Sequence, residues 1–437
     1  MKLNEKIKPL RSWLMLFSTQ SLSGLGSGMT NFALVLWLYQ KNGSALETAL
    51  LSICSYAPYV LMSIFAGALS DRWDKKRTML LCDLLAALCT VCVLVLLKTD
   101  LLLPWHLYVL NAVNGLMNTV QQPASEVVST LLIPKEYYQK TSGIRSFCNS
   151  LNTIFTPIFA TALFAFAGMD MVIAVDLITF LLAFIVLKLL VKVPPVPKAE
   201  KEKEPVFRAA GKGLVWLKEH LLILKLILFL ACVNLIASCF NAALPAMLLS
   251  RNGGSEYVLG LVNTFAGIAT LLGSGLVTLF PAPKNRVRVI CLTILLSFGT
   301  ENFLLAIGRT PLVWCMGSIL GWIAIPLMNA NLDVIFRSTI PPHMQGRVYA
   351  CRNTLQFFTI PIGYLLGGFL VDQVFEPFMA KGLAFPALLG SEKGTGAALF
   401  FLVLGITGSV MALFFLWLLR HEKWTDPPKD ISVKKEV

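Results

Sequence analysis

Charged residues are scarce in this chain. Only 14% of its 437 residues are Asp, Glu, Lys or Arg, whereas 56% are hydrophobic, and soluble domains carry about 25% charged residues. A membrane-spanning helix needs about 20 apolar residues, and the chain supplies many such runs. The runs do not alternate polar and apolar residues, which excludes a transmembrane barrel. The composition therefore predicts an all-α, polytopic membrane protein.

Several signatures of enzymes and cofactor-binding proteins are also missing. The four histidines are scattered, without the spacing of a metal site. No Gly-x-x-x-x-Gly-Lys-Ser/Thr phosphate loop occurs, and no Ser-His-Asp arrangement is evident. The ten cysteines all lie in apolar segments, where a free thiol packs as a small hydrophobic group. We therefore expect no metal, no cofactor, no disulfide framework and no enzymatic activity.

Twelve stretches are long and apolar enough to be interpreted as membrane spans. Because the number is even, both termini are expected on the same side of the membrane. The predicted spans are 13–38, 46–69, 78–98, 105–131, 141–166, 170–191, 221–249, 257–280, 289–307, 311–336, 348–374 and 396–419.

The basic residues lie mainly on one side of these spans. The two termini and the loops on their side hold 28 Lys and Arg residues, and the opposite loops hold six. Cytoplasmic loops carry the excess of Lys and Arg in membrane proteins, so both termini are predicted to be cytoplasmic. This distribution also accounts for the net charge of +13, and we expect no nucleic-acid partner.

A polar linker divides the spans six and six. It contains Pro194, Pro195 and Pro197 followed by a run of mixed charge at 198–204, a composition that cannot bury a core. Helical spacing of apolar residues returns at 206–220 and predicts a short helix on the inner membrane surface. The predicted domains are a first six-helix bundle at 1–191, a linker with an interfacial helix at 192–220, and a second six-helix bundle with its tail at 221–437.

The two halves share a faint repeat. An acid, an Ile-Pro step and an arginine recur at one offset of 207 positions. The matched pairs are Glu126 and Asp333, Ile133 and Ile340, Pro134 and Pro341, and Arg145 and Arg352. Two six-helix halves related by an axis along the membrane normal are the architecture of major facilitator transporters.

The short loop between the second and third spans carries a motif. It reads Gly-Ala-Leu-Ser-Asp-Arg-Trp-Asp-Lys-Lys-Arg over 67–77, a burst of charge between two apolar runs. It resembles the signature loop of the major facilitator superfamily, with Asp74 where the second glycine is usual. The form Asp-Arg-x-Asp followed by basic residues is similar to the macrolide-efflux branch of drug:proton antiporters.

This resemblance covers nearly the whole chain. It includes the Pro123-Ala124 step, Ile-Pro before the fifth span and Gly346-Arg347-Val348 before the eleventh. It implies twelve helices in two pseudo-symmetric bundles, working by alternating access. One departure is Thr156–Thr161, where antiporters of this kind often carry a glycine-rich motif and this chain keeps only its proline. Export and uptake both stay open for that reason.

Charged residues near the inner ends of the spans are the candidates for a gate. Acid–arginine pairs there could close the inner side in one state and break in another, and the alternative is a structural salt-bridge cluster. The resemblance implies that Asp71 locks against the start of the eleventh helix, whose amino end is positive. The gate candidates are Gly67, Asp71, Arg72, Arg77, Asp83, Glu126, Arg145, Asp333 and Arg352.

Two further acids lie deeper in predicted spans. Asp176 is in the sixth span and Glu301 is in the ninth, and neither has a basic neighbour in sequence. An ionisable group inside the membrane marks a functional site by default, and a carboxyl group withdrawn from water can take up a proton near neutral pH. Both are candidates for proton coupling, and the alternative for each is a hydrogen bond that packs helices.

The substrate cavity is expected between the first, fourth, seventh and tenth spans. Uncharged amides and aromatics at mid-span suit lipophilic, amphipathic ligands, and the alternative is that these amides bridge helices. The cavity candidates are Asn31, Asn114, Asn118, Asn234, Asn241, Trp322 and Asn329.

The sequence as a whole predicts a secondary transporter of the bacterial plasma membrane. We expect a monomer in the lipid bilayer that exchanges protons for a small lipophilic substrate and exports it. Two alternatives remain open at this point: uptake or movement of a lipid or siderophore-like molecule by the same fold, and a membrane sensor that does not transport.

Overall fold

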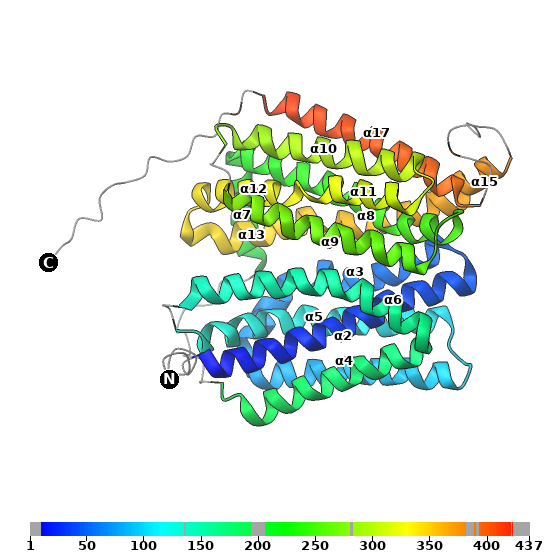
Figure 1. Cartoon of the computed structure of the whole chain (residues 1–437). Helices are drawn as coiled ribbons and strands as arrows, with labels where there is room; N and C mark the ends of the chain where they lie inside the picture. Colours follow the sequence, from blue (N-terminus) through cyan, green and yellow to red (C-terminus); the bar gives the residue numbers. More distant parts are fainter. Residues whose placement is uncertain are drawn as a thin grey trace.

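The computed structural model describes residues 10–134, 137–193, 206–279, 283–381, 389, 393–420 and 422. In these ranges the chain forms helices joined by short turns and contains no strand, which confirms the all-α prediction. The helices lie side by side in two bundles (Figure 1). Helix α2 (Arg11–Asn42) begins, and helix α17 (Thr395–Leu418) ends, at the same end of the molecule. We call it the inner end, and the opposite one the outer end.

The first bundle follows the six predicted spans. Gly168, at φ 73° and ψ −176°, interrupts α6 between the predicted fifth and sixth spans. This backbone conformation is almost restricted to glycine, so it allows the chain to change direction there. A π-helical turn, Val186–Leu190, follows α6. The helices are α2, α3 (Ala45–Arg72), α4 (Lys75–Lys98), α5 (Pro104–Leu132) and α6 (Tyr138–Ile185).

The second bundle divides two of the predicted spans into successive helices. Pro326 stands at the start of α12, and because proline lacks a backbone N–H it starts a helix more easily than it continues one. The helices are α8 (Leu221–Ser250), α9 (Glu256–Leu279), α10 (Arg286–Ile307), α11 (Pro311–Trp322), α12 (Ile325–Thr339), α13 (Pro342–Phe357), α14 (Thr359–Phe369), the π-helical turn η4 (Leu370–Phe375), α15 (Glu376–Ala380) and α17.

The predicted interfacial helix is α7 (Val206–Glu219). Its Leu217 is buried and its Trp216 nearly so, both within the apolar core of the second bundle. Helix α7 packs against α8 and α13. One face of this helix is therefore attached to the second bundle. Residues 194–205 of the linker lie outside the described residues, and the domain boundaries stay a prediction.

Nine segments of the described residues are long and apolar enough to cross a membrane. One of them, Phe147–Leu190, has 44 residues. A helix rises 1.5 Å per residue and a bilayer core is about 30 Å thick, so this segment is long enough to cross twice. Helices α2 and α5 are not among the nine and carry many polar residues. The chain is a multi-pass membrane protein, and the count of twelve spans stays a prediction.

The two bundles meet mainly along two pairs of helices, α3 with α14 and α6 with α9. At the outer end a single apolar cluster joins both bundles. It contains Leu36, Tyr39 and Ala45 from the first bundle together with Val371 and Phe400 from the second. The outer ends of the bundles are therefore packed against each other in this structure.

Candidate functional site

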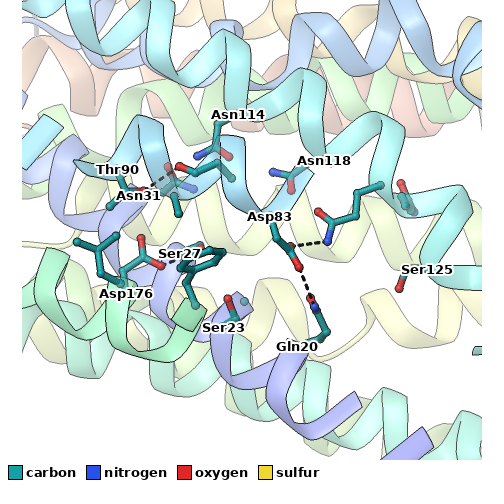
Figure 2. Close-up of a pocket in the computed structure, with 18 of the residues that line it drawn as sticks. Gln20, Ser23, Ser27, Asn31, Asp83, Thr90, Asn114, Asn118, Ser125 and Asp176 are labelled. Carbon is teal, nitrogen blue, oxygen red and sulfur yellow. Dashed lines mark hydrogen bonds between the residues drawn. The ribbon is translucent and has the colours of Figure 1, made fainter. Parts of the chain in front are cut away.

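A cavity of about 520 Å³ lies inside the first bundle, between α2, α4, α5 and the second part of α6 (Figure 2). Most of its wall is polar, formed by amides, hydroxyls and carboxylates. The lining residues are Gln20, Ser23, Gly24, Ser27, Gly28, Asn31, Asp83, Ala86, Ala87, Thr90, Asn114, Asn118, Gln121, Gln122, Ser125, Glu126, Asp176, Leu177 and Phe180.

The polar wall follows from helical spacing. Along α2, Gln20, Ser23, Ser27 and Asn31 recur every three or four residues, which places them on one face of the helix. A similar stripe runs along α5 from Asn114 through Ser125. The sequence predictions included three asparagines of these stripes and missed the serines and glutamines, although their spacing was visible in the sequence.

Asp83 reaches this cavity from α4. Its Oδ2 accepts a hydrogen bond from Gln20 Nε2 at 3.1 Å, and its Oδ1 accepts one from Gln121 Nε2 at 2.6 Å. Both donors are uncharged and come from the polar stripes of α2 and α5. The sequence predicts Asp83 as part of the inner gate, and the structure places it on the cavity wall.

Asp176 reaches the same cavity from α6. It is 4% exposed, and its Oδ1 accepts a hydrogen bond from Ser27 Oγ at 2.9 Å. A Cβ atom at Gly26 would lie 3.0 Å from Asp176 Cα and 2.4 Å from Thr179 Oγ1. The absence of a side chain at Gly26 therefore allows α2 and α6 to pack closely beside the carboxylate.

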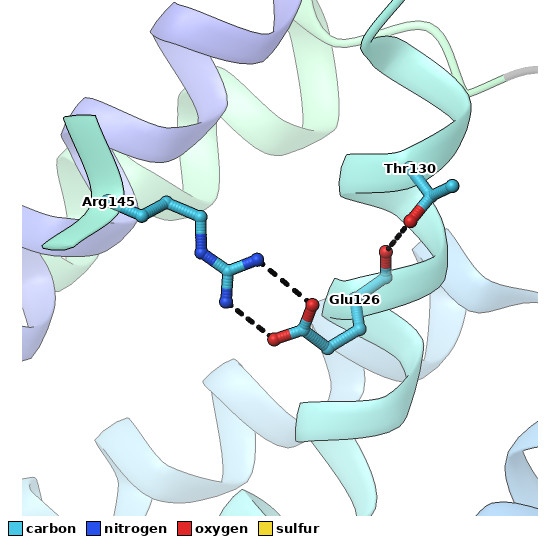
Figure 3. A network of polar contacts seen from close by, with 3 residues as sticks. All are labelled: Glu126, Thr130 and Arg145. Atoms are coloured by element: carbon cyan, nitrogen blue, oxygen red, sulfur yellow. Dashed lines mark hydrogen bonds and ion pairs between the residues drawn. The ribbon is translucent and has the colours of Figure 1, made fainter. Parts of the chain in front are cut away.

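Glu126 stands on the cavity wall toward the inner end. Its two carboxylate oxygens accept from the two terminal nitrogens of Arg145, at 2.6 and 3.0 Å (Figure 3). Thr130 Oγ1 donates to the backbone carbonyl of Glu126 one turn away. The side chains of Glu126 and Arg145 are 51% and 39% exposed, so this bidentate pair is partly open to water.

The second copy of the repeat has a different arrangement. Arg352 donates from Nε to Gln356 Oε1 at 3.0 Å, and its guanidinium lies 4.5 Å from the ring centre of Phe336. Asp333 is exposed and lies near enough to act on Arg352 electrostatically. At the offset of the repeat, Ser129 and Asn149 stand where the second half has Phe336 and Gln356. In the second half, Arg352 therefore has an aromatic ring and a longer amide side chain as neighbours, and the first half has neither at the matching positions.

Glu301 is buried between α10 and α11. Its Oε1 accepts hydrogen bonds from Trp322 Nε1 at 3.1 Å and from Ser318 Oγ at 3.4 Å. A Cβ at Gly321 would lie 2.2 Å from Glu301 Oε2, so the glycine gives the carboxylate its space. Neither Glu301 nor Trp322 lines the cavity of the first bundle.

The remaining cavity candidates divide between the bundles. Asn31, Asn114 and Asn118 line the cavity. In the second bundle, Asn234 Nδ2 donates to the backbone carbonyl of Gln356 at 3.1 Å, which is a helix-bridging contact. The other two candidate asparagines of the second bundle, Asn241 and Asn329, are exposed. The cavity wall is thus built by the first bundle, without the candidates of the seventh and tenth spans.

The signature loop is described only in part. The side chains of Asp71 and Arg72 and the surroundings of Gly67 lie outside what the structure describes. Asp74 caps α4, because its Oδ1 accepts from the backbone N of Arg77 at 2.8 Å, and aspartate is a preferred residue at this position. The Arg77 side chain itself is exposed. The departure from the usual glycine at Asp74 therefore has a local structural role.

Lys76 ties this loop to the end of the sixth predicted span. Its Nζ donates to the backbone carbonyls of Lys188 and Val191, at 3.0 and 2.7 Å. Carbonyls at the end of a helix lack internal partners and attract a positive charge.

Within the described ranges, no group of three His, Cys, Asp or Glu residues could hold a metal ion.

Comparisons with known sequences agree with this architecture. Macrolide efflux protein A of Streptococcus pyogenes is 24% identical over 372 residues, which cover 83% of this chain and 91% of that protein. Multidrug efflux pump Tap of Mycolicibacterium fortuitum is 25% identical over 398 residues, covering 88% and 95%. Staphyloferrin A transporter of Staphylococcus aureus is 20% identical over 361 residues, covering 82% and 88%.

Solved structures show the same fold at low sequence identity. A bacterial homolog of the human lysosomal transporter Spinster superposes with a TM-score of 0.68 at 14% identity, over 96% of this chain and 99% of that one. The nucleoside transporter NupG superposes with a TM-score of 0.66 at 12% identity, over 94% and 99%. The sequence profile of the Major Facilitator Superfamily matches residues 16–364. The chain therefore belongs to the Major Facilitator Superfamily of transporters.

Proposed function

We propose that this transporter is a proton-coupled exporter of lipophilic or amphipathic compounds, working by alternating access. The observation that carries the proposal is the cavity of the first bundle, which Asp83 and Asp176 both line. Among the described residues that line this cavity there is no Lys, Arg or His. The negative charges of the two carboxylates can therefore be neutralised by bound protons or by a cationic group of the substrate.

The hydrogen bonds of the two acids support a role in proton exchange. Asp83 is held by the amides of Gln20 and Gln121, and Asp176 by the hydroxyl of Ser27. A carboxyl group held by neutral donors can gain or lose a proton without breaking an ion pair. Glu301 also has neutral donors, but it does not line this cavity, so we assign coupling to Asp83 and Asp176.

The wall also supports an amphipathic substrate. Amides and hydroxyls alternate there with apolar surface from Ala86, Ala87, Leu177 and Phe180. Ligand sites commonly combine apolar surface with a few placed polar groups. Relatives named for macrolide and multidrug efflux favour export. The excess of basic residues on the side of the termini supports a plasma-membrane protein with both ends in the cytoplasm.

A second candidate is movement of a lipid or a siderophore-like molecule by the same fold, including uptake. A relative named Staphyloferrin A transporter favours keeping this candidate. The carboxylates on the cavity wall disfavour a strongly anionic cargo. Genes beside this one discriminate the two: a resistance regulator favours efflux, and lipid or siderophore genes favour the second candidate.

Drug accumulation tests the proposed function. The chain is expressed in a drug-sensitive bacterial host, and cell-associated macrolide and fluorescent lipophilic dyes are measured with and without an ionophore that removes the proton gradient. We expect lower accumulation in cells that express the chain, and loss of the difference when the ionophore is added. Equal accumulation of every compound in expressing and empty cells would remove the export proposal.

A further inference from the structure

A carboxylate joins the outer ends of the two bundles. Asp372 lies in η4 of the second bundle, and its Oδ2 accepts hydrogen bonds from Ser44 Oγ at 2.6 Å and from the backbone N of Leu46 at 2.8 Å. Its Oδ1 accepts from the backbone N of Ala45 at 3.1 Å. All three donors belong to the start of α3 in the first bundle.

The start of α3 is well suited to hold a negative charge. The first N–H groups of a helix have no partner within it, and their aligned dipoles make this end positive. Ser44 Oγ accepts from the backbone N of Glu47 at 3.2 Å while it donates to Asp372. Asp372 therefore supplies, from the other bundle, acceptors that α3 lacks on its own.

Backbone packing fixes the position of this carboxylate. One helical turn before Asp372, a Cβ at Gly368 would lie 2.7 Å from Leu46 Cα and 3.0 Å from Ala45 O. Only glycine permits this approach of α14 to the start of α3 without a backbone shift. The close contact brings the carboxylate within hydrogen-bond distance of the α3 amides.

Other hydrogen bonds between the bundles lie at the same end. Tyr39 Oη donates to the backbone carbonyl of Ala246 at 3.1 Å and lies 2.6 Å from Ser250 Oγ. The Gln40 side chain donates to the carboxylate of Glu256. Among these contacts, the one made by Asp372 places a negatively charged side chain at the positive amino end of a helix.

We propose that Asp372 is the positioning residue that holds the outer end of the transporter closed, and that its cap on α3 breaks and re-forms in each transport cycle. Opening of the outer side requires the two bundles to separate at this end, which takes Asp372 away from α3. Water can then accept hydrogen bonds from the α3 amides and donate hydrogen bonds to the Asp372 carboxylate. The proposal rests on the transporter fold and is independent of the substrate and of the coupling ion.

Glu376, four residues after Asp372, provides a matched control. Glu376 Oε1 accepts from the backbone N of Ala397, at the start of α17. Both helices of this contact belong to the second bundle, so Glu376 caps a helix without joining the bundles. Loss of its charge should affect stability and leave the relative position of the bundles unchanged.

Electron-spin distance measurements test the proposal. Spin labels are placed at Leu101 of the first bundle and Tyr257 of the second, which are 62% and 67% exposed, in a background without the ten native cysteines. The variants are Asp372→Asn, Ser44→Ala and Glu376→Gln. We expect Asp372→Asn to raise the outward-open population by roughly tenfold. Ser44→Ala, which removes one of three donors, should give a smaller shift in the same direction.

The Glu376→Gln control distinguishes a specific contact between the bundles from a general loss of helix capping. Glu376→Gln should leave the distance distribution unchanged even where it lowers the melting temperature. Asp372→Glu should restore part of the closed population, because it restores the charge. Unchanged distances in both Asp372→Asn and Ser44→Ala would overturn the proposal. An equal shift in Glu376→Gln would overturn it as well.

Discussion

Asp83 and Asp176 come from different helices and face one cavity (Figure 2). The described part of the chain gives each of them neutral hydrogen-bond donors and no cation within an ion pair. This sets the two acids apart from Glu126, whose charge is matched by Arg145. Under the proposed function, we therefore expect Asp83 and Asp176, rather than Glu126, to exchange protons.

Amide replacements test this assignment. Asp83→Asn and Asp176→Asn each keep the shape of the side chain and remove the proton-accepting oxygen. We expect at least one of them to abolish substrate-driven proton release while substrate binding persists. Binding is measured by tryptophan quenching or calorimetry, and proton release by a pH dye in the medium. Full proton release in both variants would show that neither acid couples transport to protons.

Glu301 gives a contrasting prediction about stability. In Glu301→Ala the donors Trp322 Nε1 and Ser318 Oγ lose their acceptor, and each unsatisfied buried group costs about 1–3 kcal/mol. We therefore expect a lower melting temperature in a thermal unfolding assay. Glu301→Gln keeps an acceptor oxygen and should retain both stability and proton release. Loss of proton release in a stable Glu301→Gln protein would move the coupling role to this residue.

The acid–arginine repeat belongs to the scale of helices, because its acid and its arginine lie on two helices that follow each other along the chain. Glu126 and Arg145 join α5 to α6 with two parallel hydrogen bonds. Arg352 instead packs on Phe336 and binds Gln356. The repeat seen in the sequence therefore conserves residue types more closely than it conserves contacts.

A charge swap tests the first of these pairs as a gate. A partly exposed ion pair contributes about 1 kcal/mol or less to stability, so Glu126→Arg and Arg145→Glu should change the melting temperature little. If the pair works as a gate, each single variant should slow transport, and the double variant should restore part of the rate. A double variant no faster than the single ones, at normal stability, would leave the pair without a role in gating.

The change of direction of α6 at Gly168 leads to a prediction about stability. An alanine at φ 73° and ψ −176° is strained by about 1–3 kcal/mol, so Gly168→Ala should lower the melting temperature and the yield of folded protein. Gly211 in α7 is a matched control, because a Cβ there meets no atom within 4 Å and alanine favours helix. Equal stability of Gly168→Ala and wild type would mean that the chain turns differently.

Helices could be predicted well from the sequence, and contacts less well. Long apolar runs predicted where most of the helices lie, because hydropathy sets which segments avoid water. The break before Pro326 and the polar stripe from Gln20 to Asn31 had visible signals in the sequence. The contact of Asp372 with Ser44 had none, because it joins residues 328 positions apart. The position of the cavity depends in the same way on how helices pack.

On the scale of the whole molecule, the two ends of the transporter differ. The outer ends of the bundles are joined by an apolar cluster and by the Asp372 cap, while the polar cavity reaches toward the inner end as far as Glu126. An exporter needs such a state to load a compound from the inner side. The predicted lock at Asp71, whose side chain lies outside the described residues, would hold the opposite state.

Proton flux in proteoliposomes tests the central claim most directly. Purified transporter is reconstituted with an acidic interior, an amphipathic substrate is added outside, and internal pH and substrate content are followed together. We predict that substrate uptake by inside-out molecules is accompanied by proton exit, and that Asp176→Asn or Asp83→Asn uncouples the two. Substrate movement that leaves the internal pH unchanged in the wild-type protein would contradict proton-coupled export.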